Sequence, residues 1–230
     1  MFNRIAIAVA VLSLAACAAP RPRPITRPLP VQAVLQSLPA PGEYPIDSGG
    51  SELRLLVYRA GPLANLGHNH VMVNRAVTGM VQVGADVPSS SFSLRMRAEG
   101  FVIDDAQARQ EEGGGFPGDI PEDAKAGTRR NMLSGAVLNA AEFPDITVKS
   151  VSLAGTLSEV SAELEVSVAG HSSRISVPLT LQGDAHHFDA AGSMELRQTA
   201  LGLTPYSLMH GALQVQDAMQ LKFNFRVLTN

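Results

Sequence analysis

The chain has 230 residues, of which 45% are hydrophobic and 17% are charged, with one cysteine and no tryptophan. This length suits one domain with short additions and is too short for two ordinary domains and a tail. The 18 basic and 21 acidic side chains give a net charge of −3, which argues against a nucleic-acid-binding protein that depends on a strong positive field. A single cysteine excludes an intrachain disulfide and zinc sites that need two or more cysteines.

The first predicted element is a secretory signal peptide over residues 1–16. One basic residue precedes an apolar run of about ten residues and a small-residue cleavage region. The run is shorter than the roughly 20 residues that a membrane-spanning helix needs. Leu14-Ala15-Ala16-Cys17 resembles the bacterial lipobox, and this resemblance implies that Cys17 is lipidated and becomes the first residue of the mature chain. A simple signal-peptidase cut that leaves a free thiol is the alternative.

Residues 17–43 are predicted to be a lipidated cysteine followed by a proline-rich tether. Acyl chains hold a protein at a bilayer without a transmembrane helix, since each buried methylene contributes about 0.8 kcal/mol. Repeated prolines between Pro20 and Pro41 favour an extended polyproline II conformation. Ala18 stands where an aspartate would resemble an inner-membrane retention signal. We therefore expect a periplasmic protein that is lipid-anchored in the outer membrane.

From Tyr44 onward the main sequence pattern has a period of two, which predicts antiparallel strands with one apolar and one polar face. The clearest alternating runs are Leu53–Val57, Phe92–Met96, Leu164–Val168, Ile175–Leu181 and Leu221–Val227. Turn residues such as Ala169-Gly170 separate neighbouring runs. About eight strands in one chain predict a closed barrel or a sandwich, because closure removes exposed strand edges. Pro178 lies inside the fourth run and indicates a sheet edge or a bulge.

One segment departs from this alternating pattern. Residues 104–127 contain the acidic pairs Asp104-Asp105 and Glu111-Glu112 and a run of three glycines. We expect a mobile loop whose acids are solvated, rather than paired carboxylates for acid–base catalysis. Residues 128–138 then place apolar side chains at helical spacing, which predicts one short helix that caps or plugs a barrel mouth.

Several short motifs occur in a fixed order between residues 44 and 228. They are Tyr44-Pro45-Ile46-Asp47, Ser51-Glu52-Leu53, Gly79-Met80-Val81, Val137-Leu138-Asn139, Phe143-Pro144-Asp145-Ile146, Gly155-Thr156-Leu157, Ala169-Gly170, Val177-Pro178-Leu179 and Leu201-Gly202-Leu203. This ordered set resembles the YceI-like family of periplasmic, lipocalin-like proteins. The resemblance implies an all-β fold over residues 44–230, an antiparallel lipocalin-like β-barrel of about eight strands with one short helix near a barrel mouth.

The same resemblance implies a function. Members of the family bind long isoprenoid or quinone-like tails inside the barrel, so such a ligand is expected here and no enzymatic activity is expected. The chain departs from typical members in the length of the 104–127 segment and in Leu66-Gly67-His68-Asn69-His70, which identifies a variant of the family.

The low aromatic content of 5% leaves room for a cavity inside the barrel, but it also fits a core packed with small side chains. If a cavity is present, the residues expected to contact the ligand lie on apolar strand faces, in the helix and near the mouth. They are Leu55, Val57, His68, His70, Phe92, Met96, Met132, Leu138, Phe143, Leu196, Tyr206 and Phe223.

His68 and His70 are separated by one residue, so in a strand both side chains point to the same face. We expect them to orient the polar end of the ligand together with Tyr206, and a purely structural turn is one alternative. A second alternative is a metal-binding or redox-associated protein that uses His68, His70 and His210.

Catalytic motifs are missing from the sequence. It contains no Gly-x-Ser-x-Gly elbow, and Gly113-Gly114-Gly115 lacks the Gly-Lys-Ser/Thr continuation of a phosphate-binding loop. We therefore expect a non-enzymatic protein. The family resemblance implies a lipid or isoprenoid small molecule as its partner, and the lipid anchor implies contact with the membrane. No cofactor other than a bound isoprenoid or quinone is expected, and the oligomeric state is left open.

Overall fold

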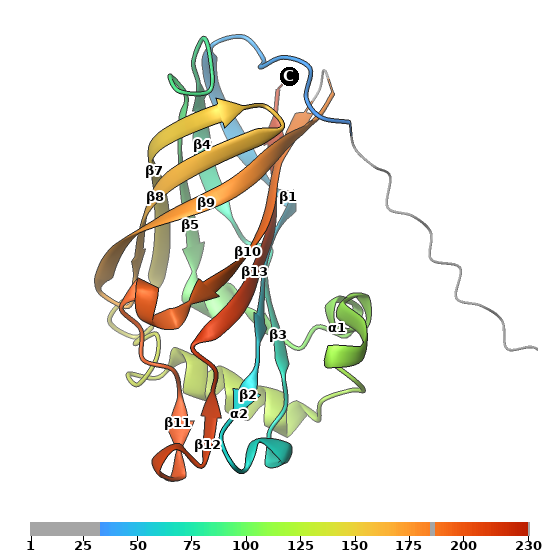
Figure 1. Cartoon of the computed structure of the whole chain (residues 1–230), viewed down its shortest axis with the longest axis vertical. Helices are drawn as coiled ribbons and strands as arrows, with labels where there is room; N and C mark the ends of the chain where they lie inside the picture. The colour runs from blue at the N-terminus through green and yellow to red at the C-terminus, as the bar shows by residue number, and fades with distance from the viewer. Residues whose placement is uncertain (1–32, 185–186, 230) are drawn as a thin grey trace, which may run out of the picture. The chain divides into compact units, whose positions relative to one another are not determined.

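The computed structural model describes residues 33–184 and 187–229 (Figure 1). Its barrel strands, in their order around the barrel, are β1 (Gly42–Val57), β4 (Thr78–Val83), β5 (Ser91–Arg97), β7 (Asp145–Thr156), β8 (Glu159–Val168), β9 (His171–Gly183), β10 (His187–Arg197) and β13 (Ala218–Leu228). Consecutive strands in this order pair antiparallel, and β13 pairs with β1 to close the barrel. The structure therefore confirms the predicted all-β, eight-stranded antiparallel barrel.

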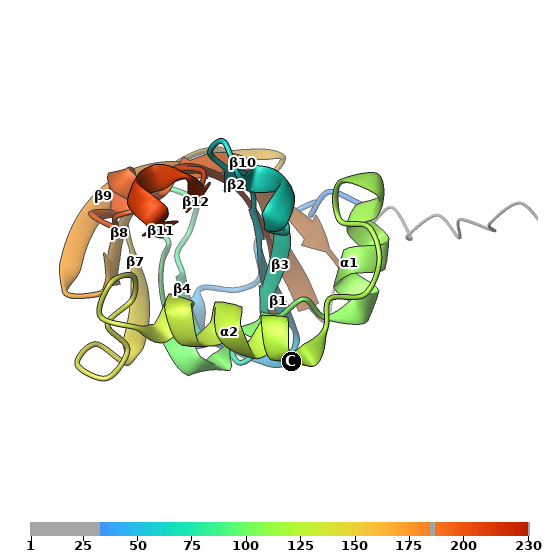
Figure 2. The same cartoon turned by 90° about the horizontal axis from the view of Figure 1, so that it is seen from below.

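The first strand, β1, is long enough to pair with two strands on the same side. Gly42–Pro45 pairs with β4, whereas Leu53–Val57 pairs with β3 (His70–Asn74). Strand β3 pairs in turn with β6 (Val102–Ile103). The β1–β13 register shifts between these two parts, as expected at a bulge that bends a strand. Because the second half of β1 pairs with β3 and no longer with β4, β1 and β4 separate at the end of the barrel where Val57 lies. Figure 2, which views the molecule from below, shows α2 (Glu122–Leu133) running along one side of the ring of strands.

A small second sheet stands beside this opening. Its strand order is β11 (Ser207–Leu208), β12 (Leu213–Val215) and β2 (Arg59–Ala60). Two loops extend from it, residues 61–67 and residues 209–212, which we call the tip loops. They contact each other through a hydrogen bond of 2.8 Å from the Leu63 N–H to the carbonyl oxygen of Ala212.

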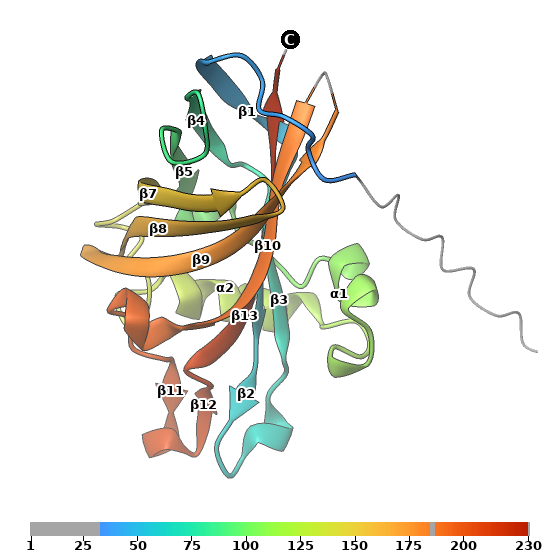
Figure 3. The ribbon, with the colours of Figure 1, turned by 45° about the horizontal axis from the view of Figure 1, so that its top comes forward.

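The segment predicted as a mobile, solvated loop is folded, so that prediction was wrong. It forms α1 (Ala106–Glu112), which begins where the Asp105 side chain accepts a hydrogen bond of 2.9 Å from the Ala108 N–H. Helix α1 lies outside the barrel beside β3 (Figures 1 and 3). A separate cluster of buried apolar side chains joins it to the outer faces of β1 and β3. Its members are Leu56, Val71, Val73, Ala108 and Phe116.

Ion pairs also hold α1 in place. Arg54, on β1, forms salt bridges of 2.9 Å to Glu111 and 2.8 Å to Glu112. Partial burial works against the charged form of Arg54, but its hydrogen bonds to Glu111, Glu112 and Glu52 raise the pKa of its guanidinium above the ordinary value. The acidic pair Glu111-Glu112 is therefore engaged in docking the helix.

The predicted helix over residues 128–138 has the wrong boundaries. Helix α2 begins at Glu122, after Pro121, and turns replace it beyond Leu133. Its first turn carries the acids Glu122 and Asp123, which are favourable at a helix N-terminus. Because these residues are polar, a search for apolar side chains at helical spacing does not detect this turn. The apolar pattern therefore identified only the second half of the helix and extended it into the turns that follow. The described residues also form two α-helices, α1 and α2, rather than the single helix expected.

Two further features concern β9. Pro178 pairs with Ser161 of β8 but lies two residues outside the pairing of β9 with β10, which ends at Thr180. The missing N–H of the proline therefore costs no bond in that pairing, although β9 is an inner strand of the barrel and not an edge strand. At the C-terminal end of β9, Gln182 forms a β-bridge with Val34, and the next residue, Leu35, is buried in the core. The end of the segment predicted as a tether thus contacts the barrel.

Candidate ligand cavity

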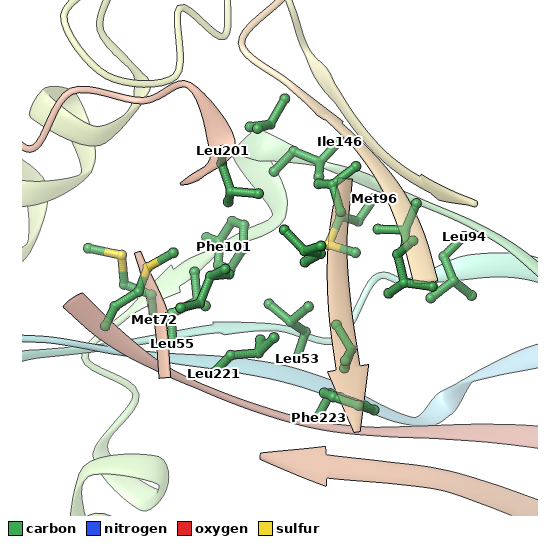
Figure 4. Close-up of a pocket in the computed structure, with 18 of the residues that line it drawn as sticks. Leu53, Leu55, Met72, Leu94, Met96, Phe101, Ile146, Leu201, Leu221 and Phe223 are labelled. Carbon is green, nitrogen blue, oxygen red and sulfur yellow. The ribbon is translucent and has the colours of Figure 1, made fainter. Parts of the chain in front are cut away.

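The barrel encloses a cavity of about 450 Å³, and all eight barrel strands contribute to its wall. Alternate residues of each strand face inward, which is the arrangement that the period-two pattern predicts. Figure 4 shows inward-pointing side chains around this space, among them Leu53, Met96 and Phe223. The question left open by the composition is thereby answered, because the barrel is not filled by its own side chains. The volume falls in the range of roughly 300–1,000 Å³ that is typical of small-molecule sites.

The polar side chains that line the cavity gather mostly at one end, beside the second sheet and α2. They are Tyr58, Arg59, His68, His70, Thr128, Asn131, Tyr206 and Gln214. Only Ser90 and Gln198 add polar side chains elsewhere along the wall, and the remaining lining is apolar. No aspartate, glutamate or lysine occurs among the described residues that line it. The cavity thus has a long apolar part and a polar mouth without acidic groups.

His70 is held in place at this mouth by a buried carboxylate. Its Nδ1 lies 2.7 Å from Oδ2 of Asp104, whose side chain is fully buried. The other carboxylate oxygen of Asp104 accepts hydrogen bonds of 3.0 Å from the Val71 N–H and 2.6 Å from Arg109. The residue has a left-handed backbone with φ of 55°, which aspartate tolerates better than most residues. Three donors therefore converge on one carboxylate behind the imidazole ring.

This arrangement determines the charge of Asp104 and the tautomer of His70. Burial acts to raise the pKa of Asp104, but hydrogen bonds from His70, Val71 and Arg109 outweigh it and hold the pKa below its ordinary value. The ionised carboxylate has no proton to donate, so His70 carries a proton on Nδ1. The opposite ring nitrogen, Nε2, lies on the side of Thr128, whose hydroxyl oxygen is 3.5 Å away.

Arg109 holds Asp104 and the neighbouring segments in place. Its guanidinium is almost fully buried and donates to the carbonyl oxygens of Asn69, Pro117 and Gly118 as well as to Asp104. It also lies over the ring of Phe116, 5.8 Å from the ring centroid. The acidic segment that looked solvated in the sequence therefore supplies the support of the histidine.

All residues predicted to contact a ligand line the cavity except Phe143. Phe143 precedes β7 and packs on Gly170, where an added Cβ would come within 2.7 Å of its ring. It is not in a strand, so the inward alternation does not apply to it. The polar lining residues Tyr58, Thr128, Asn131 and Gln214 were not predicted. Tyr58 follows β1 and Gln214 lies in a three-residue strand, while Thr128 and Asn131 are polar positions of α2 that apolar spacing does not single out.

The alternative metal site is not assembled. Over residues 33–184 and 187–229 no group of three or more histidine, cysteine, aspartate or glutamate side chains is arranged to hold a metal ion. His68 stacks edge-on against His70, with ring centroids 6.2 Å apart, while His210 belongs to the outer tip loop. The signal peptide and Cys17 lie outside the described residues. Within the described part, no helix is long and apolar enough to cross a membrane.

A closed antiparallel barrel with an apolar interior and a polar mouth defines a lipocalin-like β-barrel protein. A family model described as the YceI-like domain matches residues 44–227, and the chain therefore belongs to the YceI-like family. No curated protein matches it.

Solved structures share this fold at low sequence identity. BcnA of Burkholderia cenocepacia is 13% identical with a TM-score of 0.59, over 79% of this chain and 98% of that chain. A polyisoprenoid binding domain from Saccharophagus degradans, implicated in plant cell wall breakdown, is 12% identical with a TM-score of 0.54, over 81% and 98%. The YceI protein of Campylobacter jejuni is 9% identical with a TM-score of 0.50, over 69% and 84%.

Proposed function

We propose that this protein binds one long apolar ligand, isoprenoid or quinone-like, with its tail inside the barrel. The observation that carries the proposal is the cavity of about 450 Å³, apolar along the barrel and polar at one mouth. Such a cavity fits an amphiphile with a small polar end. The fold shared with the polyisoprenoid binding domain of Saccharophagus degradans supports this ligand class.

The tail would be bound mainly by burial of apolar surface, at roughly 25 cal/mol per Å². Flexible methionine side chains at the cavity wall, Met72, Met96, Met132 and Met219, adapt to the contour of such a tail. The polar end would lie at His68, His70 and Tyr206. Binding without catalysis is the simplest role for this site, since the cavity wall offers an apolar surface with few reactive groups.

We also propose a location for the protein at the outer membrane. The lipobox-like Leu14-Ala15-Ala16-Cys17 supports lipidation of Cys17 and anchoring in the outer membrane on the periplasmic side. In this setting the protein would carry or store a membrane-derived molecule that is poorly soluble in water.

Mass spectrometry of an organic-solvent extract tests the proposed ligand. The protein, purified without detergent from a host that makes isoprenoid lipids, is expected to release a long-chain lipid in a near-stoichiometric amount. Extracts of the same host membranes show which lipids are available for selection. An extract without lipid, together with failure of an added apolar fluorescent probe to bind, would overturn the proposal.

A further inference from the structure

The hydrogen bonding of His70 has a chemical consequence for the ligand. Because Nδ1 donates to the buried Asp104 at 2.7 Å, a neutral imidazole presents Nε2 to the cavity as a lone-pair acceptor. The neighbouring hydroxyl of Thr128 is 3.5 Å from Nε2, at the limit of hydrogen-bond distance. Nε2 therefore has capacity for a shorter bond to a donor that enters the mouth.

Asp104 and Arg109 form a charge-neutral pair behind the ring, joined at 2.6 Å, so Arg109 already balances the carboxylate. Both groups are buried, and neither lines the cavity. They do not contact a ligand in the cavity and act on it only by positioning His70. Asp104, held by Arg109, fixes the orientation of the His70 ring and the ring nitrogen that carries its proton.

We propose that His70 accepts a hydrogen bond from a hydroxyl group at the polar end of the ligand. This inference rests on the proposed function and narrows it to a long-chain alcohol or phenol, such as an isoprenoid alcohol or a reduced quinone. An ether or an oxidised quinone offers no donor and would leave Nε2 unsatisfied, which is costly in a dry site.

Paired probes that differ only in the donor test this inference. Farnesol and farnesyl methyl ether are competed against N-phenyl-1-naphthylamine at pH 8. The wild-type protein is expected to prefer the alcohol by about tenfold. His70→Asn keeps an N–H donor for Asp104 but removes the Nε2 acceptor, so it is expected to bind both probes equally and to bind the ether as the wild type does.

One further variant keeps the test decisive. His210→Asn makes the same change at a histidine that does not line the cavity, and it is expected to retain the preference for the alcohol. Equal binding of the two probes by the wild type, or an unchanged preference in His70→Asn, overturns the role of His70. If neither probe binds to any variant, the proposed function fails as well, so the two failures are distinguishable.

A different observation concerns the outer surface beside the mouth. Leu66 and Met209 are the most exposed large hydrophobic residues described, at 66% and 67%, and Leu208 is exposed as well. Leu66 and Met209 lie in the tip loops, which are in contact with each other, and Leu208 is the last residue of β11. Met209 and His210 also have left-handed backbones, with φ of 51° and 56°, so the chain holds an unfavourable conformation to present these side chains.

The charge of this region is distinctive. Residues 58–70 and 201–216 contain no aspartate or glutamate, although the chain has 21 acidic residues. The same segments contain Arg59 as their one formally charged side chain, together with His68, His70 and His210. A surface with exposed Leu and Met side chains, an arginine and no acidic side chain complements a bilayer with anionic headgroups.

The apolar surface of the tip is continuous with the cavity. Leu208 and Leu213, on either side of one tip loop, line the cavity, and Gly67 contributes to the lining from the other tip loop. A ligand leaving a bilayer at this point would enter the barrel without crossing water. We infer that the tip loops dock on the surface of an anionic phospholipid bilayer and insert Leu66 and Met209 among the lipids.

Vesicle co-sedimentation tests this docking surface. A chain that begins at position 17, with Cys17→Ser, removes any acyl anchor, and vesicles of phosphatidylethanolamine and phosphatidylglycerol are the probe. The double variant Leu66→Glu/Met209→Glu is expected to weaken vesicle binding at least tenfold. Val102→Glu/Val151→Glu is the matched control, because these two valines are exposed elsewhere, and it is expected to bind as the parent chain does.

Binding of farnesol in solution separates this proposal from the proposed function. The tip variant is expected to retain it, because Leu66 and Met209 do not line the cavity. Vesicle binding that is equal in the tip variant and its parent overturns the docking proposal and leaves ligand binding intact. If the parent chain is dimeric and the tip variant monomeric in size-exclusion chromatography, the tip is an interface between copies, and the bilayer proposal is likewise overturned.

Discussion

Replacing Ala190 with phenylalanine is expected to weaken binding of an apolar ligand about 50-fold. Ala190 lies on the inward face of β10 and lines the cavity of about 450 Å³. The added ring would exclude roughly three methylene-sized groups of the ligand, and each is worth about 0.8 kcal/mol, which together correspond to this factor. Titration of N-phenyl-1-naphthylamine fluorescence measures the change.

The matched control is Glu195→Phe. Glu195 belongs to the same strand but is exposed on its outward face, so a phenylalanine there leaves the cavity unchanged. Both variants are compared with the wild type by thermal unfolding, because an overpacked interior also costs stability. A folded Ala190→Phe protein with the affinity of the wild type would show that the probe binds outside the barrel.

The barrel was predictable because its signal is local. Alternation in runs such as Phe92–Met96 and Leu221–Val227 depends only on neighbouring residues, and each run became a barrel strand. The split pairing of β1 was not predictable, since it depends on a register shift between Asp47 and Glu52 that no residue pattern specifies. The open cavity was likewise undetermined, because it depends on how far eight strands separate when they close.

In the candidate site, too, some features were predictable from the sequence and others were not. The prediction that His68 and His70 share a face assumed that both lie in a strand. Both line the cavity, but only His70 belongs to β3, so the period-two spacing is not what brings His68 there. Their support was missed, because Asp104 lies 34 residues from His70 in the sequence and belongs to an acidic segment without periodicity. Arg54 likewise meets Glu112 at a separation of 58 residues. Contacts of this kind arise only when distant segments meet in the folded chain.

Replacing Asp104 with asparagine is expected to lower the free energy of unfolding by about 3 kcal/mol at pH 7. The change removes the carboxylate that pairs with Arg109 at 2.6 Å and leaves a buried guanidinium without its counter-charge. Arg109 keeps its bonds to backbone carbonyl oxygens, which places the effect at the lower end of the range for buried pairs. Urea denaturation measures it. Asp189→Asn is the matched control, because Asp189 is also buried but its partner Arg226 is partly exposed, so a smaller loss is expected.

The pH dependence of this difference identifies its cause. The pKa of Asp104 is held below its ordinary value in the folded protein, despite burial, by its hydrogen bonds to His70, Val71 and Arg109. A carboxyl group with a lowered pKa contributes stability that is fully present above the unfolded value of about 3.9 and is lost as the pH falls through the folded value. The wild type therefore loses this contribution below about pH 4. The asparagine side chain of the variant does not titrate, so the stability difference between wild type and Asp104→Asn should shrink as the pH falls from 7 to 3. A constant difference over that interval would mean that the substitution acts through packing and not through the charge of Asp104.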